Sequence, residues 1–172
     1  MGVVWDSFKG LGKLILITTG LFILGGMVGY CYLWSNPELV ISNLDKFLGN
    51  ILKIGEAMSK NSKLYVTWLI FQNNVKALLS IMFGGVVFGI FPLFSILFNG
   101  FAVGLVMALS FYQGKTLAFF LAAMLPHGIL ELPAIFIGGA FGIQTGMDLV
   151  FPGVHSRKQR LMENLKRQVL AL

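Results

Sequence analysis

The chain has 172 residues, of which 56% are hydrophobic and only 12% are charged, and its formal net charge at pH 7 is +6. Soluble domains carry about 25% charged residues, so this composition excludes an ordinary soluble protein and indicates an integral membrane protein. A membrane-spanning helix takes about 20 apolar residues, so about four or five spans fit and a separate soluble catalytic domain does not. The basic residues flank apolar runs, which is typical of membrane topology and argues against nucleic-acid binding.

The first predicted span covers residues 13–34. Lys9 and Lys13 precede its apolar run. Its C-terminal end carries the aromatic residues typical of a membrane interface, Tyr30, Tyr32 and Trp34. The apolar run is longer than the core of about 7–15 residues in a cleavable signal peptide. We therefore expect this segment to be retained as a transmembrane helix.

Residues 37–63 differ from the rest of the chain because their charges are mixed. Apolar residues recur there every three or four positions, which predicts an amphipathic helix. They are Val40, Leu44, Phe47, Ile51, Ile54 and Met58. This seam is a candidate partner-binding surface, and it is equally suited to covering the outer end of the bundle, to lying on the membrane or to packing against a second subunit.

The apolar sequence of residues 64–111 is too long for one span and long enough for two. We place the reversal at Pro92, because proline suits a helix start, and expect helices over about 65–90 and 92–112. The competing break at Asn99-Gly100 leaves only about a dozen apolar residues for the following helix.

The last apolar stretch, residues 117–147, follows the polar loop 113–116. It is either one long helix kinked at Pro126 and Pro133, or a half-helix over residues 117–125 that breaks at Pro126-His127-Gly128. The candidate positions for a helix break in the chain are therefore Pro126, Gly128, Pro133 and Gly100.

Charge distribution predicts the topology. The segment 155–172 holds five cations and one acid: Arg157, Lys158, Arg160, Lys166, Arg167 and Glu163. Cytoplasmic flanks are enriched in Lys and Arg, so we expect both termini in the cytoplasm and hence an even number of spans. The prediction is a single multi-pass domain of the cell membrane, residues 1–172, with four spans in residues 13–34 and 65–147, an extracytoplasmic segment 37–63 and a basic cytoplasmic tail.

Glycines four residues apart occur in every predicted span. The pairs are Gly25/Gly29, Gly85/Gly89, Gly100/Gly104, Gly138/Gly142 and Gly142/Gly146. Such faces let helix backbones approach closely in a membrane, where no hydrophobic effect drives helices together. Packing inside one subunit is the first interpretation, and contacts between subunits or thinning near a pore are the alternatives.

Polar residues within the spans form the candidate intramembrane site. His127 and Glu131 lie four residues apart, so on a helix they share one face. An ionisable group in hydrocarbon costs about 3 kcal/mol or more, so the two side chains either pin the helix as a pair or serve as a proton or ion relay. Asn73, Asn74 and Asn99 also need partners, either in other helices or in an aqueous cavity.

No cofactor, metal site or enzymatic activity is expected. A structural zinc site needs four ligands and a catalytic one needs three, whereas His127 and Glu131 provide two. The sequence contains no G-x-S-x-G, H-E-x-x-H or P-loop motif.

A set of motifs in a fixed order resembles the stage II sporulation protein M family. The residues are Phe71-Gln72-Asn73-Asn74, Gly85 and Gly89 before Pro92, Asn99-Gly100 with Gly104, and Pro126-His127-Gly128 with Glu131 and Pro133. The resemblance covers residues 10–150. It implies a small polytopic membrane protein without an established enzymatic activity, and in spore-forming bacteria members anchor cell-wall hydrolases. Members commonly continue into one further hydrophobic helix. The residues Val169-Leu170-Ala171-Leu172 resemble the beginning of such a helix.

We therefore expect a non-enzymatic scaffold that organises partners through residues 37–63 and forms a homo-oligomer. The partners expected are the lipid bilayer, further copies of the chain and extracytoplasmic proteins. The alternative is a channel or transporter whose path is lined by the intramembrane polar site.

Overall fold

The computed structural model describes residues 10–44, 46–49, 63–153 and 156–171, and the elements within these ranges are all helices. They are α2 (Gly12–Ser35), α3 (Pro37–Ser42), α5 (Lys63–Phe83), the 3₁₀ helix η1 (Gly84–Val86), α6 (Ile90–Tyr112), α7 (Leu117–Val150) and α8 (Arg157–Ala171). Four candidate membrane spans occur in this part of the chain, in α2, α5 with η1, α6 and α7. The predicted all-α bundle with about four spans is confirmed.

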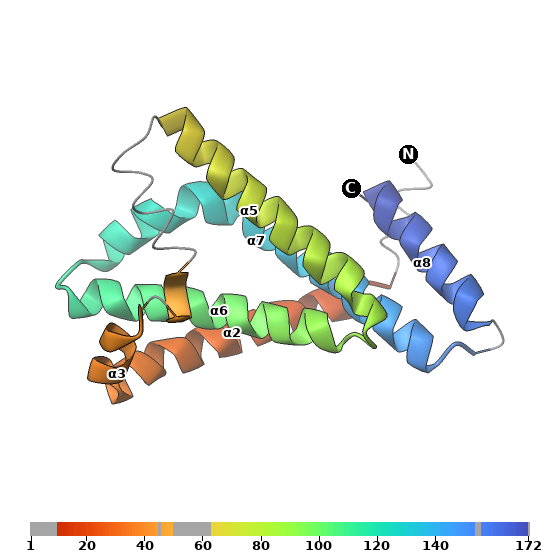
Figure 1. The fold of residues 1–172 in the computed structure, drawn as a ribbon, viewed down its shortest axis with the longest axis horizontal. Coiled ribbons are helices and arrows are strands. Elements are labelled where there is room, and N and C mark those ends of the chain that lie inside the picture. Colours follow the sequence, from red (N-terminus) through yellow and green to blue (C-terminus); the bar gives the residue numbers. More distant parts are fainter. Residues whose placement is uncertain (1–9, 45, 50–62, 154–155, 172) are drawn as a thin grey trace.

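The four long helices alternate in direction (Figure 1). α2 and α6 run one way, and α5 and α7 run the other way. Leu11, next to the start of α2, packs with Met82 near the end of α5 and with Phe141 in α7. Gln168 in α8 reaches the carbonyl oxygens of Met82 and Phe141. The first turn of α2 and the last turns of α8 therefore lie at the same end of the bundle.

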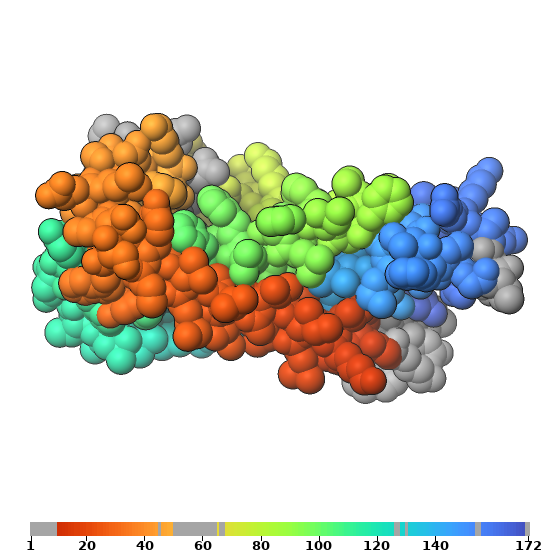
Figure 2. Space-filling model, turned by 90° about the horizontal axis from the view of Figure 1, so that it is seen from below, coloured from red at the N-terminus to blue at the C-terminus, as the bar shows by residue number. Residues whose placement is uncertain are grey.

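α2 and α6 form the closest helix pair, and glycine makes this possible. A Cβ added to Gly25 would overlap the carbonyl oxygen of Leu97, and one on Gly29 would overlap that of Phe101. In the opposite direction, a Cβ on Gly104 would overlap the carbonyl oxygen of Gly26. The two helices lie side by side in both views (Figures 1 and 2). These glycines serve packing within one subunit, where backbone contact replaces side-chain contact.

The reversal between the second and third spans lies at residues 84–89 and not at Pro92. α5 ends at Phe83, and Gly89 precedes α6 with φ of 73°. That backbone conformation is left-handed and favours glycine. Pro92 lies buried in the first turn of α6, so it stands near a helix start as expected, but the turn itself lies before it and contains Gly84, Gly85 and Gly89. A Cβ on Gly85 would overlap the carbonyl oxygen of Gly142 in α7, so the turn packs directly on that helix.

α7 is a single helix of 34 residues, which corrects the predicted breaks at Pro126, Gly128 and Pro133. The helix continues through these positions and changes direction along its length (Figure 1), as the kinked-helix alternative requires. Gly100 is likewise no break, since it lies inside α6 against the backbone of Phe22. At 1.5 Å per residue, α7 is about 50 Å long against a hydrocarbon core of about 30 Å, so part of it extends beyond the membrane.

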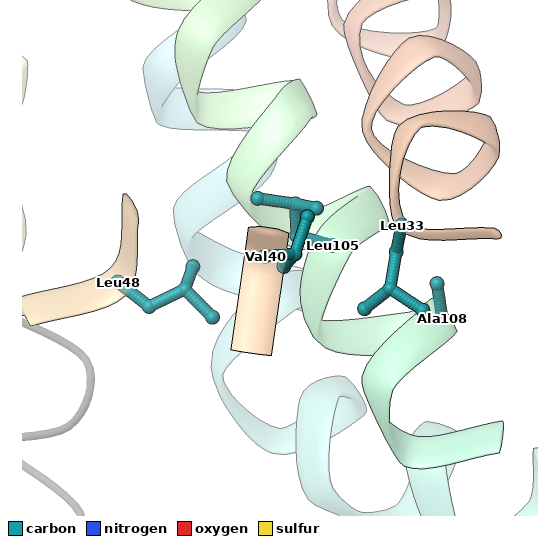
Figure 3. Close-up of a cluster of buried hydrophobic side chains, with 5 residues drawn as sticks. All are labelled: Leu33, Val40, Leu48, Leu105 and Ala108. Carbon is teal, nitrogen blue, oxygen red and sulfur yellow. The ribbon is translucent and has the colours of Figure 1, made fainter. Parts of the chain in front are cut away.

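The segment after α2 folds back over the end of the bundle where α2 and α6 end. Val40 in α3 and Leu48 are buried in one cluster with Leu33 of α2 and with Leu105 and Ala108 of α6 (Figure 3). The predicted seam begins here, so its first half has an apolar partner within the same chain. Ile51, Ile54 and Met58 lie outside the described residues.

Candidate functional site: polar residues of the spans

α5 carries a polar stripe, which we define as Asn73, Lys76 and Ser80. The three side chains are exposed and lie at spacings of three and four residues, so they share one face of the helix. They fall within the candidate span Trp68–Val86. The opposite side of α5 faces α7, because Leu78 meets Gly138 and Ile81 meets Gly142. The polar stripe therefore lies on the outside of this subunit.

Lys76 is the least expected member of the polar stripe. It stands eight residues from Trp68 and ten from Val86, at about 12–15 Å from either end of the candidate span. A lysine near a helix end can bring its ammonium group to the membrane interface, but one at mid-span is too far away. Such a group normally faces another helix or water.

Asn74 and Glu131 belong to the side on which α5 and α7 meet. Asn74 is half-buried one turn before Leu78, and Glu131 is half-buried two turns before Gly138. Leu78 and Gly138 are in contact. The two helices run in the same direction. Asn74 and Glu131 therefore both lie on the N-terminal side of the contact between Leu78 and Gly138. The side chain of His127 lies outside the described part of the structure, so the geometry of the predicted pair is not defined.

Asn99 is separate from this group. Its Nδ2 donates a hydrogen bond to the carbonyl oxygen of Ser95, one turn back in α6, at 2.8 Å. This bond is local to its own helix. In the described part of the chain, the predicted site therefore divides into a part on α5 with α7 and a part within α6.

A polar contact that the sequence reasoning missed joins α2 to α7. The Oγ1 of Thr18 lies 2.9 Å from the carbonyl oxygen of Ile15 and 3.1 Å from that of Phe136, so its single proton is shared between the two acceptors. Thr18 is completely buried. A single threonine in an apolar run has no sequence pattern that separates this interhelical role from a bond within its own turn.

A second missed group holds α8 against the bundle. Gln168 is fully buried, and its Nε2 donates to the Oγ1 of Thr145 at 2.8 Å and to the carbonyl oxygen of Met82 at 3.3 Å. One turn earlier, the Nδ2 of Asn164 donates to the Oδ2 of Asp148 at 3.0 Å. The spacing of Leu161, Asn164, Leu165 and Gln168 in the basic tail is the signal that predicts such a face.

The described residues that were predicted to bind partners already pack against other residues of this subunit. Of these residues, Val40 is buried, and Leu44 and Phe47 pack with Tyr32 and Phe101 against the same cluster, which also contains Leu48. Exposed apolar surface at this end comes from neighbouring positions such as Trp34, Leu39, Ile41 and Tyr112. A partner at this end would meet these side chains and not the buried members of the seam.

The fold and these sites define a class: a polytopic α-helical membrane protein whose helices meet through glycine contacts, with α3 covering one end of the bundle and α8 docked on α7. The profile of the family described as stage II sporulation protein M matches residues 18–172. The chain belongs to this family. It is 26% identical over 158 residues to an uncharacterized protein, MJ0793, from Methanocaldococcus jannaschii, covering 92% of this chain and 82% of that protein. No solved structure matches.

Proposed function

We propose that the protein is a non-enzymatic scaffold of the cell membrane, and that the polar stripe of α5 is the surface on which a second copy of the chain assembles. Both termini lie in the cytoplasm in this proposal, and the end of the bundle covered by α3 and residues 46–49 faces the opposite side. The scaffold role agrees with the resemblance to the family.

The exposed Lys76 is the observation that carries the proposal. A lone subunit would present an ammonium group, an amide and a hydroxyl to hydrocarbon at mid-span, where polar groups are costly. A helix from a second copy would supply hydrogen-bond acceptors and would cover the polar stripe. Hydrogen bonds between membrane helices contribute about 0.6 kcal/mol each on average, so several are needed for stable association.

The interior of the subunit supports a scaffold more than a path for ions. The described buried clusters are apolar, and the buried hydroxyls of Thr18 and Thr145 donate to backbone carbonyl oxygens. Where α2 meets α6 and α7 meets η1, backbone packs on backbone through glycine. Such contacts leave little room for water between those helices.

The test is the oligomeric state of the full chain in lipid nanodiscs, read by native mass spectrometry. We expect assemblies of two or more copies for the native chain and single copies for the triple variant N73L/K76L/S80A. The leucines suit a lipid-facing surface, so the subunit should keep its helix content. The variant K115Q removes one cation from an exposed loop residue outside the spans and should assemble normally.

A native chain that stays single at all concentrations in lipid would overturn the assembly on α5. A stripe variant that assembles as well as the native chain would do the same. Loss of helix content in the triple variant is checked separately by circular dichroism, and the single change K76L then repeats the test with the least disturbance.

A channel or transporter is the second candidate, because Asn74 and Glu131 are both half-buried where α5 and α7 meet. It predicts ion or proton flux into vesicles that contain the protein, reduced in the variant E131Q. The scaffold predicts no flux above that of empty vesicles and normal assembly of E131Q.

A further inference from the structure

The orientation of α8 about its own axis is determined by two buried amides. Asn164 and Gln168 lie one turn apart and bind Asp148 and Thr145 in α7. Ser156 and Gln159 also cap the helix start, since the backbone N–H of Ser156 donates to Oε1 of Gln159 and that of Gln159 donates to Oγ of Ser156. With one face held in this way, the side chains on the other faces have defined directions.

The position of α8 is at the edge of the membrane. Gln168 reaches the carbonyl oxygen of Met82, at the end of α5, and Met82 packs with Leu11 just before α2. Lys13 is exposed in the first turn of α2. The last turns of α8 thus lie at the end of the bundle where α2 begins, beside the final turns of the candidate spans Trp68–Val86 and Glu131–Val150.

One exposed face of α8 alternates cations and apolar side chains. We define the basic flank as Lys158, Met162, Lys166 and Val169, which lie at spacings of four, four and three residues. All four are exposed, and Met162 and Val169 are exposed to 52% and 64%. Such spacing places them along one side of the helix. Isolated apolar residues on a surface need no explanation, but here they alternate with lysines along a helix at the membrane edge.

The other exposed side of α8 has a different character. It contains Glu163, whose carboxylate lies 3.7 Å from the guanidinium of Arg160, and Arg160 also donates to the carbonyl oxygen of Pro152. On this side the negative charge of Glu163 is paired with the positive charge of Arg160 in the same helix. The basic flank contains no acidic residue, and its two lysines, Lys158 and Lys166, stand eight residues apart on the same face.

We propose that the basic flank of α8 binds the headgroups of anionic phospholipids in the leaflet on the side of the termini. Met162 and Val169 enter the boundary between headgroups and acyl chains, and Lys158 and Lys166 place their ammonium groups at the phosphates. The charge of the flank is complementary to such lipids, and its apolar residues fit a bilayer surface better than a free soluble anion. The docked α8 therefore gives the protein a lipid preference that its spans alone do not provide.

The experiment uses the full chain in neutral detergent micelles, with M162W as the only tryptophan in the background W5F/W34F/W68F. Brominated phosphatidylglycerol is titrated in, and quenching of the tryptophan gives an apparent Kd. We expect strong quenching by this lipid and much weaker affinity for brominated phosphatidylcholine. E163W, one position along on the other exposed side, should be quenched less.

Charge variants in the M162W background make the test specific. Each lysine near an anionic surface strengthens binding about fivefold, so K158Q/K166Q should raise the apparent Kd for phosphatidylglycerol roughly twentyfold. The matched variant R157Q/R167Q removes the same charge from the same helix outside the basic flank and should change the Kd by less than about threefold. Added salt should weaken binding to the native chain.

Equal affinity for both lipids, or an unchanged Kd in K158Q/K166Q, would overturn the proposal. So would equal quenching of M162W and E163W. Quenching of M162W that disappears as protein concentration rises would show that a second copy covers the basic flank, which also contradicts it. Circular dichroism of each variant confirms that α8 remains folded, as expected for changes at exposed positions.

Discussion

The side-chain amide of Gln168 in α8 donates a hydrogen bond to the hydroxyl of Thr145 in α7 at 2.8 Å, with both side chains buried. The two residues are 23 positions apart in the chain. Because α8 is otherwise a short, highly charged helix, this contact and the one between Asn164 and Asp148 decide whether it stays docked.

The variant Q168A should release α8. It removes the amide that reaches Thr145 and Met82, and leaves a buried cavity in its place, so local opening of the helix becomes easier. We expect cleavage by trypsin after the basic residues of α8 to become at least several-fold faster, with the rest of the bundle intact. V169A changes an exposed neighbour and should leave the cleavage rate unchanged; equal rates for Q168A and V169A would contradict the role of Gln168.

The variant G25A should destabilise the bundle. Its Cβ would overlap the carbonyl oxygen of Leu97, so α2 and α6 must separate. Overpacking of this kind costs about 1–3 kcal/mol in free energy of unfolding. Gly20, on the same helix, has open space around it, and G20A should be neutral or slightly stabilising. The comparison is made by unfolding in mixed micelles, and a G25A variant as stable as G20A would refute the close contact.

The variant G89A should destabilise the turn between α5 and α6. Gly89 has φ of 73°, and a residue with a Cβ pays about 1–2 kcal/mol in that region. The melting temperature in lipid should fall accordingly. G49A provides the comparison, since Gly49 has no neighbour within 4 Å of an added Cβ and no positive φ, and it should melt as the native chain does.

The variant T18V should weaken the contact between α2 and α7. Valine has nearly the same shape as threonine but cannot donate to the carbonyl oxygen of Phe136. Interhelical hydrogen bonds in membranes average about 0.6 kcal/mol, so we expect a loss of free energy of unfolding near that size. T19V removes a hydroxyl that bonds only to Ile15 in its own helix and should cost less. A larger loss in T19V than in T18V would argue against the contact.

The orientation proposed for the termini can be measured by cysteine labelling in the background C31S. The loop residue Lys115 and the α8 residue Lys158 lie at opposite ends of the bundle and are both exposed. In intact cells, a membrane-impermeant maleimide should label K115C and should label K158C only after the membrane is opened. The reverse pattern would place the basic tail outside and contradict the charge rule on which the orientation depends.

Several features were predictable because they depend on composition and local pattern. Four apolar runs of sufficient length define the spans, since every backbone polar group in a membrane must bond within its own segment. The glycine pairs of α2 and α6 were also recognisable, because close approach leaves small residues at fixed spacing. The sequence predicted the amphipathic seam that begins at Val40, although not which surface it covers.

Other features depend on distant parts of the chain. The two prolines left a kinked helix and a broken helix as alternatives for α7, and the structure keeps one helix through Pro126 and Pro133. The reversal before α6 lies at glycines because Gly85 and Gly89 meet Gly142 and Gly146, which are more than fifty residues away.

The sequence by itself determined that this is a four-span membrane protein, because apolar length and charge flanks are local properties with direct energetic consequences in a bilayer. The tertiary structure alone decided which polar groups are satisfied and which are exposed. Asn99 bonds within its own turn, Gln168 is buried against α7, and Lys76 lies on the outside of α5. The physical reason is that a helix has several faces, and only the packing of its neighbours decides which face meets protein.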